Sequence, residues 1–365
     1  MTEPGRSLAL DVFRGATLAL MIIVNMSISE ALSFGPLLHA AWDGLTLTDL
    51  VFPSFLFAVG NALSLTLPGY QSLGTAAVLA KVARRGALLF LLGVFVSNFP
   101  FGALVDGGWT WLPAEKLRIF GVLQRIALCW VGAALLLHLC RPRTVVVVAV
   151  ACLIAHGLTL QFGGDLSLAG NAARRIDLWV LGATHLYGGE GLPYDPEGLL
   201  GTLPSLVNVL AGYAAGEWLR RGGRLGPLLA AGALALGAAL LWSCWQPVNK
   251  KLWTGSYALH CIGVDLLLLA ALRELLDRRG WRLGTTPFVA LGRNTLFIYL
   301  VAELLMSLLW TLPLQGQPAF EWVFAHVFQP WAGDKTGSLA FALALLACCT
   351  ALALWMQHRR WFVRV

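Results

Sequence analysis

Near the start of the chain, three polar residues have side-chain types that can act together as a base, an orienting acid and a hydrogen-bond donor. His39 lies in a short loop, Asn25 ends the apolar segment before it, and Asp49 begins the apolar segment after it. An imidazole is well suited to act as a base near neutral pH, an amide can donate to an oxyanion, and a carboxylate can orient the imidazole. The set predicts general-base chemistry at His39, with Asp43 competing with Asp49 for the orienting role.

Asp11 and Arg14 are charged residues inside the first apolar segment. A charge near the centre of a bilayer costs at least a few kcal/mol, so such residues usually face the interior of a bundle or a wet cavity. Their spacing of three residues places them on one face of a helix, where they could pair. Two interpretations stay open, a structural ion pair and a functional site.

The composition excludes a soluble globular domain and favours a membrane protein. Hydrophobic residues make up 58% of the 365 residues, charged residues 12%, and the mean hydropathy is positive. The net charge of +7 does not require a nucleic-acid partner, because topology explains where the basic residues fall. We expect one all-α domain over residues 1–365, a polytopic membrane helix bundle, and we expect no cleavable signal peptide.

About ten segments are long and apolar enough to cross a bilayer. They are residues 8–29, 47–67, 84–100, 118–139, 144–161, 199–219, 226–243, 256–273, 286–311 and 338–357. One set of connections carries about sixteen basic residues and the opposite set about seven, a bias that predicts both termini on the cytoplasmic side. The loop with His39 then faces outward.

The outward connections are the long ones, and they hold many polar and aromatic side chains. Such loops carry function more often than the elements they join. As substrate-binding candidates we take Trp42, Asp43, His185, Asp195, Glu197, Asn249, Lys250 and Trp253, with Glu303 from the ninth segment. The competing interpretation is that the lysines contact lipid headgroups and Trp253 anchors the chain at the interface.

Several signals are missing. The seven cysteines show no paired spacing, so neither a disulfide framework nor a metal site is expected. There is no glycine-rich nucleotide loop and no zinc-protease motif.

Motifs along nearly the whole chain resemble one known family. SLALDVFRG, MIIVN and HAAWDGLTLTDLVFPSFLFAVG open the chain, and the later runs are LRIFGVLQRIAL, RRIDLWVLGATHLY, YDPEGLLGTLPSLVN, PVNKKLWTGSYAL and GRNTLFIYLVAELL. In this order they resemble the heparan-α-glucosaminide N-acetyltransferase family, including its bacterial NagX-like members. The resemblance implies a multi-pass acyltransferase of the inner (plasma) membrane.

The resemblance also implies the reaction. Family members transfer an acetyl group from cytosolic acetyl-CoA to the amine of a glucosamine residue on the far side of the membrane. The active-site histidine falls on His39 and the functional asparagine on Asn25. Only a few residues precede the first segment, which favours a small amino sugar or short oligosaccharide as acceptor. Direct transfer and an acetylated His39 both stay open, as does a homodimer.

Coenzyme A carries phosphates, which clustered cations bind. The candidates for holding acetyl-CoA are Arg14, Arg84, Arg85, Arg125, Arg293 and Asn294. Among them Arg14 ranks lower because Asp11 competes for it, and Arg125 lies too far outward for the phosphates and is expected to face the acyl arm or the acceptor. The alternative functions are an amino-sugar transporter or permease and a non-catalytic scaffold.

Overall fold

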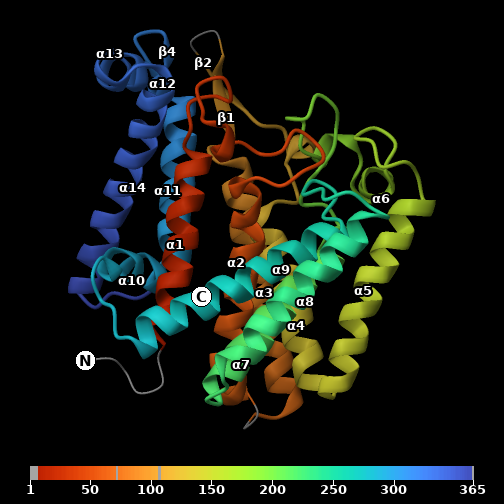
Figure 1. Cartoon of the computed structure of the whole chain (residues 1–365). Coiled ribbons are helices and arrows are strands. Elements are labelled where there is room, and N and C mark those ends of the chain that lie inside the picture. The colour runs from red at the N-terminus through yellow and green to blue at the C-terminus, as the bar shows by residue number, and fades with distance from the viewer. Residues whose placement is uncertain (1–6, 71–72, 106–107, 364–365) are drawn as a thin grey trace.

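The computed structural model describes residues 7–70, 73–105 and 108–363 and is mostly helical (Figure 1). Its helices are α1 (Leu8–Asn25), α2 (Leu47–Thr66), α3 (Thr75–Asn98), α4 (Val122–Leu139), α5 (Pro142–Phe162), α6 (Ala172–Leu181), α7 (Thr202–Arg220), α8 (Leu225–Ser243), α9 (Gly255–Leu272), α10 (Thr285–Arg293), α11 (Thr295–Thr311), α12 (Ala319–Val323), α13 (Gln329–Ala332) and α14 (Asp334–His358). There are two short antiparallel hairpins, β1–β2 (Gly102–Val105 and Gly108–Trp111) and β3–β4 (Pro313–Leu314 and Gln317–Pro318), and short 3₁₀- or π-helical segments flank or connect these elements.

Six helices are long and apolar enough to cross a membrane: α1, α2 with the turn that follows it, α4, α5, α8 and α14. The pair α10–α11 would add a seventh span if it is counted as one. Each of the ten segments expected from the sequence overlaps a long helix or this pair. The multi-pass helical class therefore holds, whereas the number of ten spans stays a prediction.

The expected single segment 286–311 is wrong as a straight helix. It is divided at Asn294, and α10 and α11 meet at 87°. The physical reason is the side chain of Asn294, which uses both ends of its amide on the C-terminal segment. Its Nδ2 donates to the carbonyl of Trp361 at 3.1 Å, and its Oδ1 accepts from the backbone N–H of Val363 at 3.1 Å. Hydropathy alone does not report such a contact.

Glycines allow the central helices to pack closely. A Cβ atom added at Gly60 of α2 would overlap the carbonyl oxygen of Val209 in α7, and one added at Gly212 of α7 would overlap that of Phe57 in α2. Close backbone approach through small residues is a common way to join helices where no hydrophobic effect acts between them. The α2–α7 pair therefore forms a fixed centre between the two ends of the bundle.

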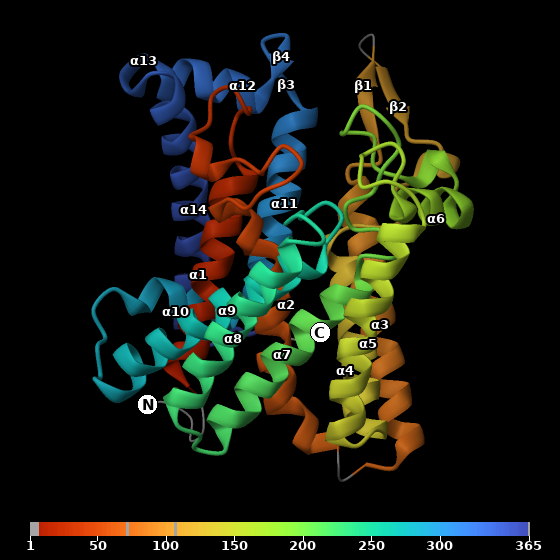
Figure 2. The same ribbon diagram turned by 45° about the vertical axis from the view of Figure 1, so that its right-hand side comes forward.

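The two ends of the bundle differ in content. Asp11 of α1, Arg293 at the end of α10 and the segment near Trp361 lie together, so both described ends of the chain share one end of the bundle. The opposite end holds the long loops, both hairpins and α6, α12 and α13, as Figures 1 and 2 show. We call these the terminal end and the loop end. Which of them faces the cytoplasm stays a prediction.

Candidate active site

The centre of the candidate site is a histidine–aspartate pair at the loop end. His39 Nδ1 lies 2.7 Å from Asp49 Oδ1. Asp49 occupies the first turn of α2 and is completely buried, whereas the His39 side chain is 46% exposed. A buried carboxylate thus holds an imidazole whose outer side remains accessible.

The partners of Asp49 define which nitrogen of His39 can act as a base. Its second oxygen, Oδ2, accepts from the backbone N–H groups of Ala40 at 3.1 Å and Thr46 at 3.0 Å. Two N–H donors favour the ionised carboxylate, which then accepts the Nδ1 proton of His39. The free lone pair is therefore on Nε2, the arrangement that a general base needs.

The loop between α8 and α9 brings a lysine against this imidazole. Lys250 Nζ lies 3.0 Å from both Nδ1 and Nε2 of His39. Because it is equidistant from the two ring nitrogens, the amino group lies against the ring rather than in line with either lone pair. The amino group of Lys250 therefore occupies the space beside the proposed base.

The backbone around Lys250 is fixed to the loop of His39. Val248 accepts from the N–H of Gly44 at 2.7 Å, and Asn249 Nδ2 donates to Asp43 Oδ1 at 3.0 Å. The Oδ1 of the buried Asn249 also accepts from the N–H of Leu252 at 2.8 Å. Asp43 and Asn249, both expected to bind substrate, thus join the two loops in this structure.

A second charged cluster belongs to the long loop between α6 and α7. Arg118 binds Asp195 with two nitrogens, at 3.0 and 2.8 Å, and binds Glu197 Oε2 at 2.8 Å. Its guanidinium also lies over the ring of Tyr187, 4.6 Å from the centroid. Bidentate pairs of this kind give directional as well as energetic stabilisation.

Electrostatics connect this cluster to His39. Burial alone would raise the pKa of Glu197, but the positive charges of Arg118, Arg125 and Lys250 outweigh it and hold that pKa below its usual value. Glu197 therefore carries a negative charge at neutral pH, and it shares Lys250 as a neighbour with the His39–Asp49 pair. Two of the acids expected from the sequence, Asp195 and Glu197, thus lie in one network.

Arg125 of α4 lies fully within the protein. Its Nη2 donates to the carbonyl of Gly198 at 2.8 Å, and its guanidinium lies 4.9 Å from the ring centroid of Trp253. Its Nε and Nη1 have no hydrogen-bond partner among the described residues. A buried guanidinium with two nitrogens that make no hydrogen bond is suited to bind an oxygen atom of a ligand.

Trp42 and His185, also expected to bind substrate, make contacts to backbone carbonyls. Trp42 Nε1 donates to Leu166 at 2.9 Å, and His185 Nδ1 lies 2.7 Å from the carbonyl oxygen of Leu117. The rings of Trp42 and Tyr194 are 6.1 Å apart. Both residues help to fix the loops in this structure, and their substrate roles stay predictions.

Asn25 hydrogen-bonds to an acid of another helix. Its Nδ2 donates to Glu303 Oε1 of α11 at 3.0 Å. Among the described residues no hydrogen bond joins Asn25 to His39. The Asn25–Glu303 contact joins α1 to α11 at the loop end, and the oxyanion role of Asn25 stays a prediction.

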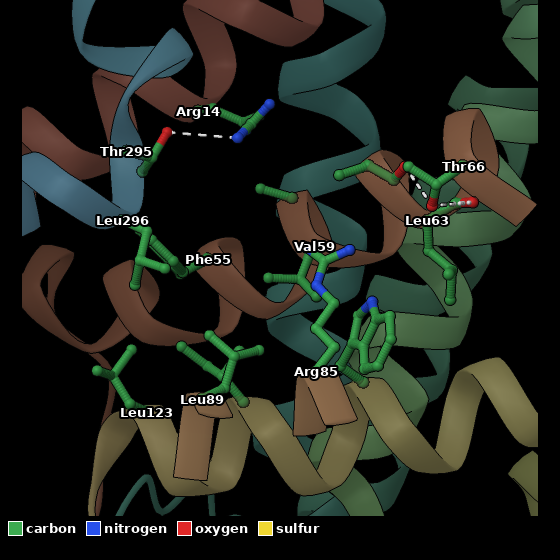
Figure 3. A pocket seen from close by; sticks show the side chains of 14 residues that line it. Arg14, Phe55, Val59, Leu63, Thr66, Arg85, Leu89, Leu123, Thr295 and Leu296 are labelled. Atoms are coloured by element: carbon green, nitrogen blue, oxygen red, sulfur yellow. Dashed lines mark hydrogen bonds between the residues drawn. The ribbon is translucent and has the colours of Figure 1, made fainter. Parts of the chain in front are cut away.

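A cavity of about 130 Å³ opens among α1, α2, α3, α4 and α11. Its walls are mainly apolar, with Phe55, Leu89 and Leu296 among them, and Arg14 and Arg85 contribute its charges (Figure 3). Arg14 Nη2 lies 3.5 Å from Thr295 Oγ1. Arg85 lies over Trp130, 4.6 Å from the ring centroid, and its Nε is buried without a hydrogen-bond partner in the described chain.

The other four residues expected to bind acetyl-CoA lie outside the lining of this cavity; they are Arg84, Arg125, Arg293 and Asn294. Arg84 is exposed on α3. Arg293 Nε lies 3.9 Å from Asp11 Oδ2, and Asn294 holds the C-terminal segment. The structure therefore separates the six candidates into two that line the cavity, Arg14 and Arg85, and four that do not.

Sequence reasoning overlooked Arg118, which was counted only as a basic residue of an outward connection. Its charge lies at the centre of the network with Asp195 and Glu197. The available signal was charge complementarity, because the arginine that begins the fourth apolar segment and the acidic pair in DPEG were expected on the same face. The sequence could not show that Lys250, rather than Lys251, lies against His39.

Comparisons with known proteins place these observations in a family. The model of the family described as heparan-alpha-glucosaminide N-acetyltransferase, catalytic, matches residues 6–242. The heparan-alpha-glucosaminide N-acetyltransferase of Homo sapiens is 29% identical over 361 residues, 82% of this chain and 53% of that protein. The Mus musculus protein of the same name is 30% identical, over 83% of this chain and 54% of its own. The chain thus spans about half the length of the curated relatives it matches.

Proposed function

Because the chain belongs to the heparan-alpha-glucosaminide N-acetyltransferase family, we propose that it transfers an acetyl group from acetyl-CoA to the amine of a glucosamine-type sugar across a membrane. The observation that carries this proposal is the His39–Asp49 pair, in which a buried carboxylate holds Nδ1 of a half-exposed imidazole and an amino group, that of Lys250, already lies 3.0 Å from Nε2. An amine attacks a thioester only in its neutral form, so the reaction requires a base near neutral pH.

In this mechanism His39 Nε2 takes a proton from the acceptor amine as the amine attacks the acetyl carbonyl. Asp49 keeps Nδ1 protonated and stabilises the imidazolium that forms. The oxyanion of the tetrahedral intermediate needs a donor, and removing one such donor typically costs about 10²–10³ in rate. Asn25 is the donor that the family resemblance favours, and Arg125 is the structural alternative because two of its nitrogens lack partners.

The cavity at Arg14 and Arg85 is our candidate for the pantetheine arm of acetyl-CoA. At about 1.5 Å of rise per residue, its lining residues Phe55 and Thr66 lie about 9 Å and about 25 Å along α2 from Asp49. The cavity therefore extends from the C-terminal half of α2, which lies toward the terminal end of the bundle, to within about 9 Å of the level of the His39–Asp49 pair. Apolar walls suit the arm, and Arg14 and Arg85 supply positive charge for phosphates or carbonyl oxygens.

For the acceptor we propose the loop end, where His39 is half exposed. A protonated amino sugar would be attracted by the negative charge of Glu197. The acceptor in this proposal is a small amino sugar or short oligosaccharide. We place the protein in the inner (plasma) membrane, with the loop end outside the cell and the terminal end in the cytoplasm. The reason for this orientation is that basic residues concentrate at the terminal end.

The direct test uses the purified protein in sealed vesicles, with acetyl-CoA on one side and glucosamine on the other. Formation of N-acetylglucosamine that depends on acetyl-CoA is the expected result. Uptake of unmodified sugar without acetyl-CoA would instead favour a transporter and overturn the proposal.

The proposed sidedness has a separate test. A cysteine introduced at Gly188, in the loop before α7, should react with a membrane-impermeant thiol reagent in intact cells, and one introduced at Gly226, in the first turn of α8, should not. Gly188 and Gly226 are both exposed, lie at opposite ends of the bundle and have open space for a side chain, so the pair is matched. The reverse pattern would invert the bundle and place His39 on the side of acetyl-CoA.

A further inference from the structure

Lys250 places a primary amine beside His39, at the position where the proposed function requires the amine of the acceptor sugar. Its Nζ lies 3.0 Å from His39 Nε2, against the ring, and catalytic hydrogen bonds in ligand-free enzymes are often poorly aligned and tighten only in the complex. The turn that carries it is fixed by Asn249 and by the Gly44–Val248 hydrogen bond, so the lysine is held at this position by the fold.

The neighbouring lysine gives an internal comparison. Lys251 Nζ forms an ion pair with Glu190 Oε2 at 2.5 Å. Lys250 has no such pair, because no carboxylate oxygen of the described residues lies within 4.0 Å of its Nζ. Two adjacent lysines therefore differ in their partners: Lys251 is bound by a carboxylate, and Lys250 lies against a base.

Burial also lowers the pKa of Lys250, although the charges of Glu197 and Asp49 oppose the shift. A lower pKa increases the neutral fraction of the amine, and only the neutral amine is nucleophilic. Holding a nucleophile beside a base and an activated acyl group gives a large advantage over reaction with free amines in solution.

We propose that Lys250 is a self-acetylation site, modified by the protein's own acetyl donor when no acceptor sugar is bound; this inference rests on the proposed function. The neutral Nζ attacks the carbonyl carbon of the acetyl-CoA thioester, the N–C bond forms and the C–S bond breaks. His39 takes the proton lost by Nζ and delivers it to the sulfur of coenzyme A. The products are Nε-acetyl-Lys250 and coenzyme A thiol.

At the same position, Lys250 could also receive an acetyl group from an acetylated His39. If the acetyl group first resides on Nε2, the neighbouring neutral Nζ attacks it there, the N–C bond of the amide forms, the bond between Nε2 and the acetyl carbon breaks, and Nε2 takes the proton that Nζ loses. An amide is far more stable than a thioester, so the modification persists. It removes a positive charge and fills the space beside His39, and the enzyme loses activity as Lys250 becomes acetylated.

The experiment incubates the purified full chain with acetyl-CoA alone and maps acetylated lysines by mass spectrometry. We expect acetylation of Lys250 over time, with Lys251 largely unmodified, and protection by added glucosamine. His39→Ala should slow the modification of Lys250 by at least about 10², the scale of a lost acid–base group. Activity remaining after preincubation should fall in step with the modified fraction.

Each other outcome has a definite meaning. Acetylation of glucosamine with Lys250 unmodified would overturn this inference and leave the proposed function intact. Equal labelling of Lys250 and Lys251, or equal labelling of Lys250 in His39→Ala, would show uncatalysed chemical acetylation and would also overturn it. If neither glucosamine nor Lys250 is acetylated, the proposed function and the inference both fail.

Discussion

The ion pairs at the two ends of the bundle differ in burial and in how far apart their members lie in the sequence. At the loop end, the charges of Arg118, Asp195 and Glu197 are largely buried and bound to one another across more than seventy residues of sequence. At the terminal end, the ion pairs of Glu217 with Arg220 and Arg221 join residues of a single helix turn and are largely open to solvent on the arginine side.

This difference indicates what each end has to do. Buried, fully paired charges hold loops in one arrangement, which a site for chemistry requires. Local, exposed pairs constrain only their own helix turn, and the cavity lined by Arg14 and Arg85 adds positive charge among mainly apolar walls. The contrast between a rigid loop end and a permissive terminal end can be tested by removing one charge at a time.

The largest effect is expected from Arg118→Ala. It leaves Asp195 and Glu197 buried without their counter-charge, and breaking a buried pair in this way typically destabilises a protein by about 3–5 kcal/mol. Thermal unfolding in detergent should show the loss. Adding Asp195→Asn and Glu197→Gln to the same variant should recover part of it, because the unpaired charges are then gone; failure to recover would mean that the network is not electrostatic in origin.

Next is the loss of the base. His39→Ala should leave the protein folded, because the histidine side chain is half exposed, and should lower acetyl transfer to glucosamine by at least about 10². The measurement is initial rate at saturating acetyl-CoA, with the unfolding temperature as control. Turnover like that of the wild type would remove His39 from the mechanism.

A smaller effect is expected at the cavity. Arg85→Ala removes a cation from the lining and should weaken binding of acetyl-CoA about tenfold, the scale of one charged hydrogen bond. Arg84→Ala is the matched control, since Arg84 is the neighbouring arginine but is exposed on α3. Calorimetric titration distinguishes them, and equal losses in both variants would move the phosphates out of this cavity.

The smallest effect is expected from Glu217→Gln. Exposed ion pairs contribute little, so the free energy of unfolding should change by less than about 1 kcal/mol. Unfolding measured beside the Arg118→Ala variant gives the comparison directly. A loss as large as that of Arg118→Ala would abolish the distinction between the two ends.

Sequence reasoning reached the helices better than the contacts between loops. Hydropathy located the long apolar segments because burial in lipid or protein depends on composition. It missed the bend at Asn294 because that bend depends on an amide and two backbone groups nearly seventy residues away. The His39–Asp49 pair could be expected because only ten residues separate its members.

Partners far apart in sequence were out of reach. Lys250 and His39 are 211 residues apart, and Asn25 and Glu303 are 278 apart, so nothing in the local pattern connects them. Such pairs depend on how the helices pack, and in this bundle the packing is set by close contacts such as that between Gly60 and Val209. A single sequence gives the type of each residue but not which residues the packing brings together.

The amide of Asn294 also has a consequence for biosynthesis. Its two partners, Trp361 and Val363, follow it by 67 and 69 residues. At about 5–20 residues per second, a ribosome delivers them roughly 3–14 s after Asn294 itself. During that interval the break between α10 and α11 lacks the two hydrogen bonds that close it, so the corner beside the first helix is completed only when synthesis has reached Val363.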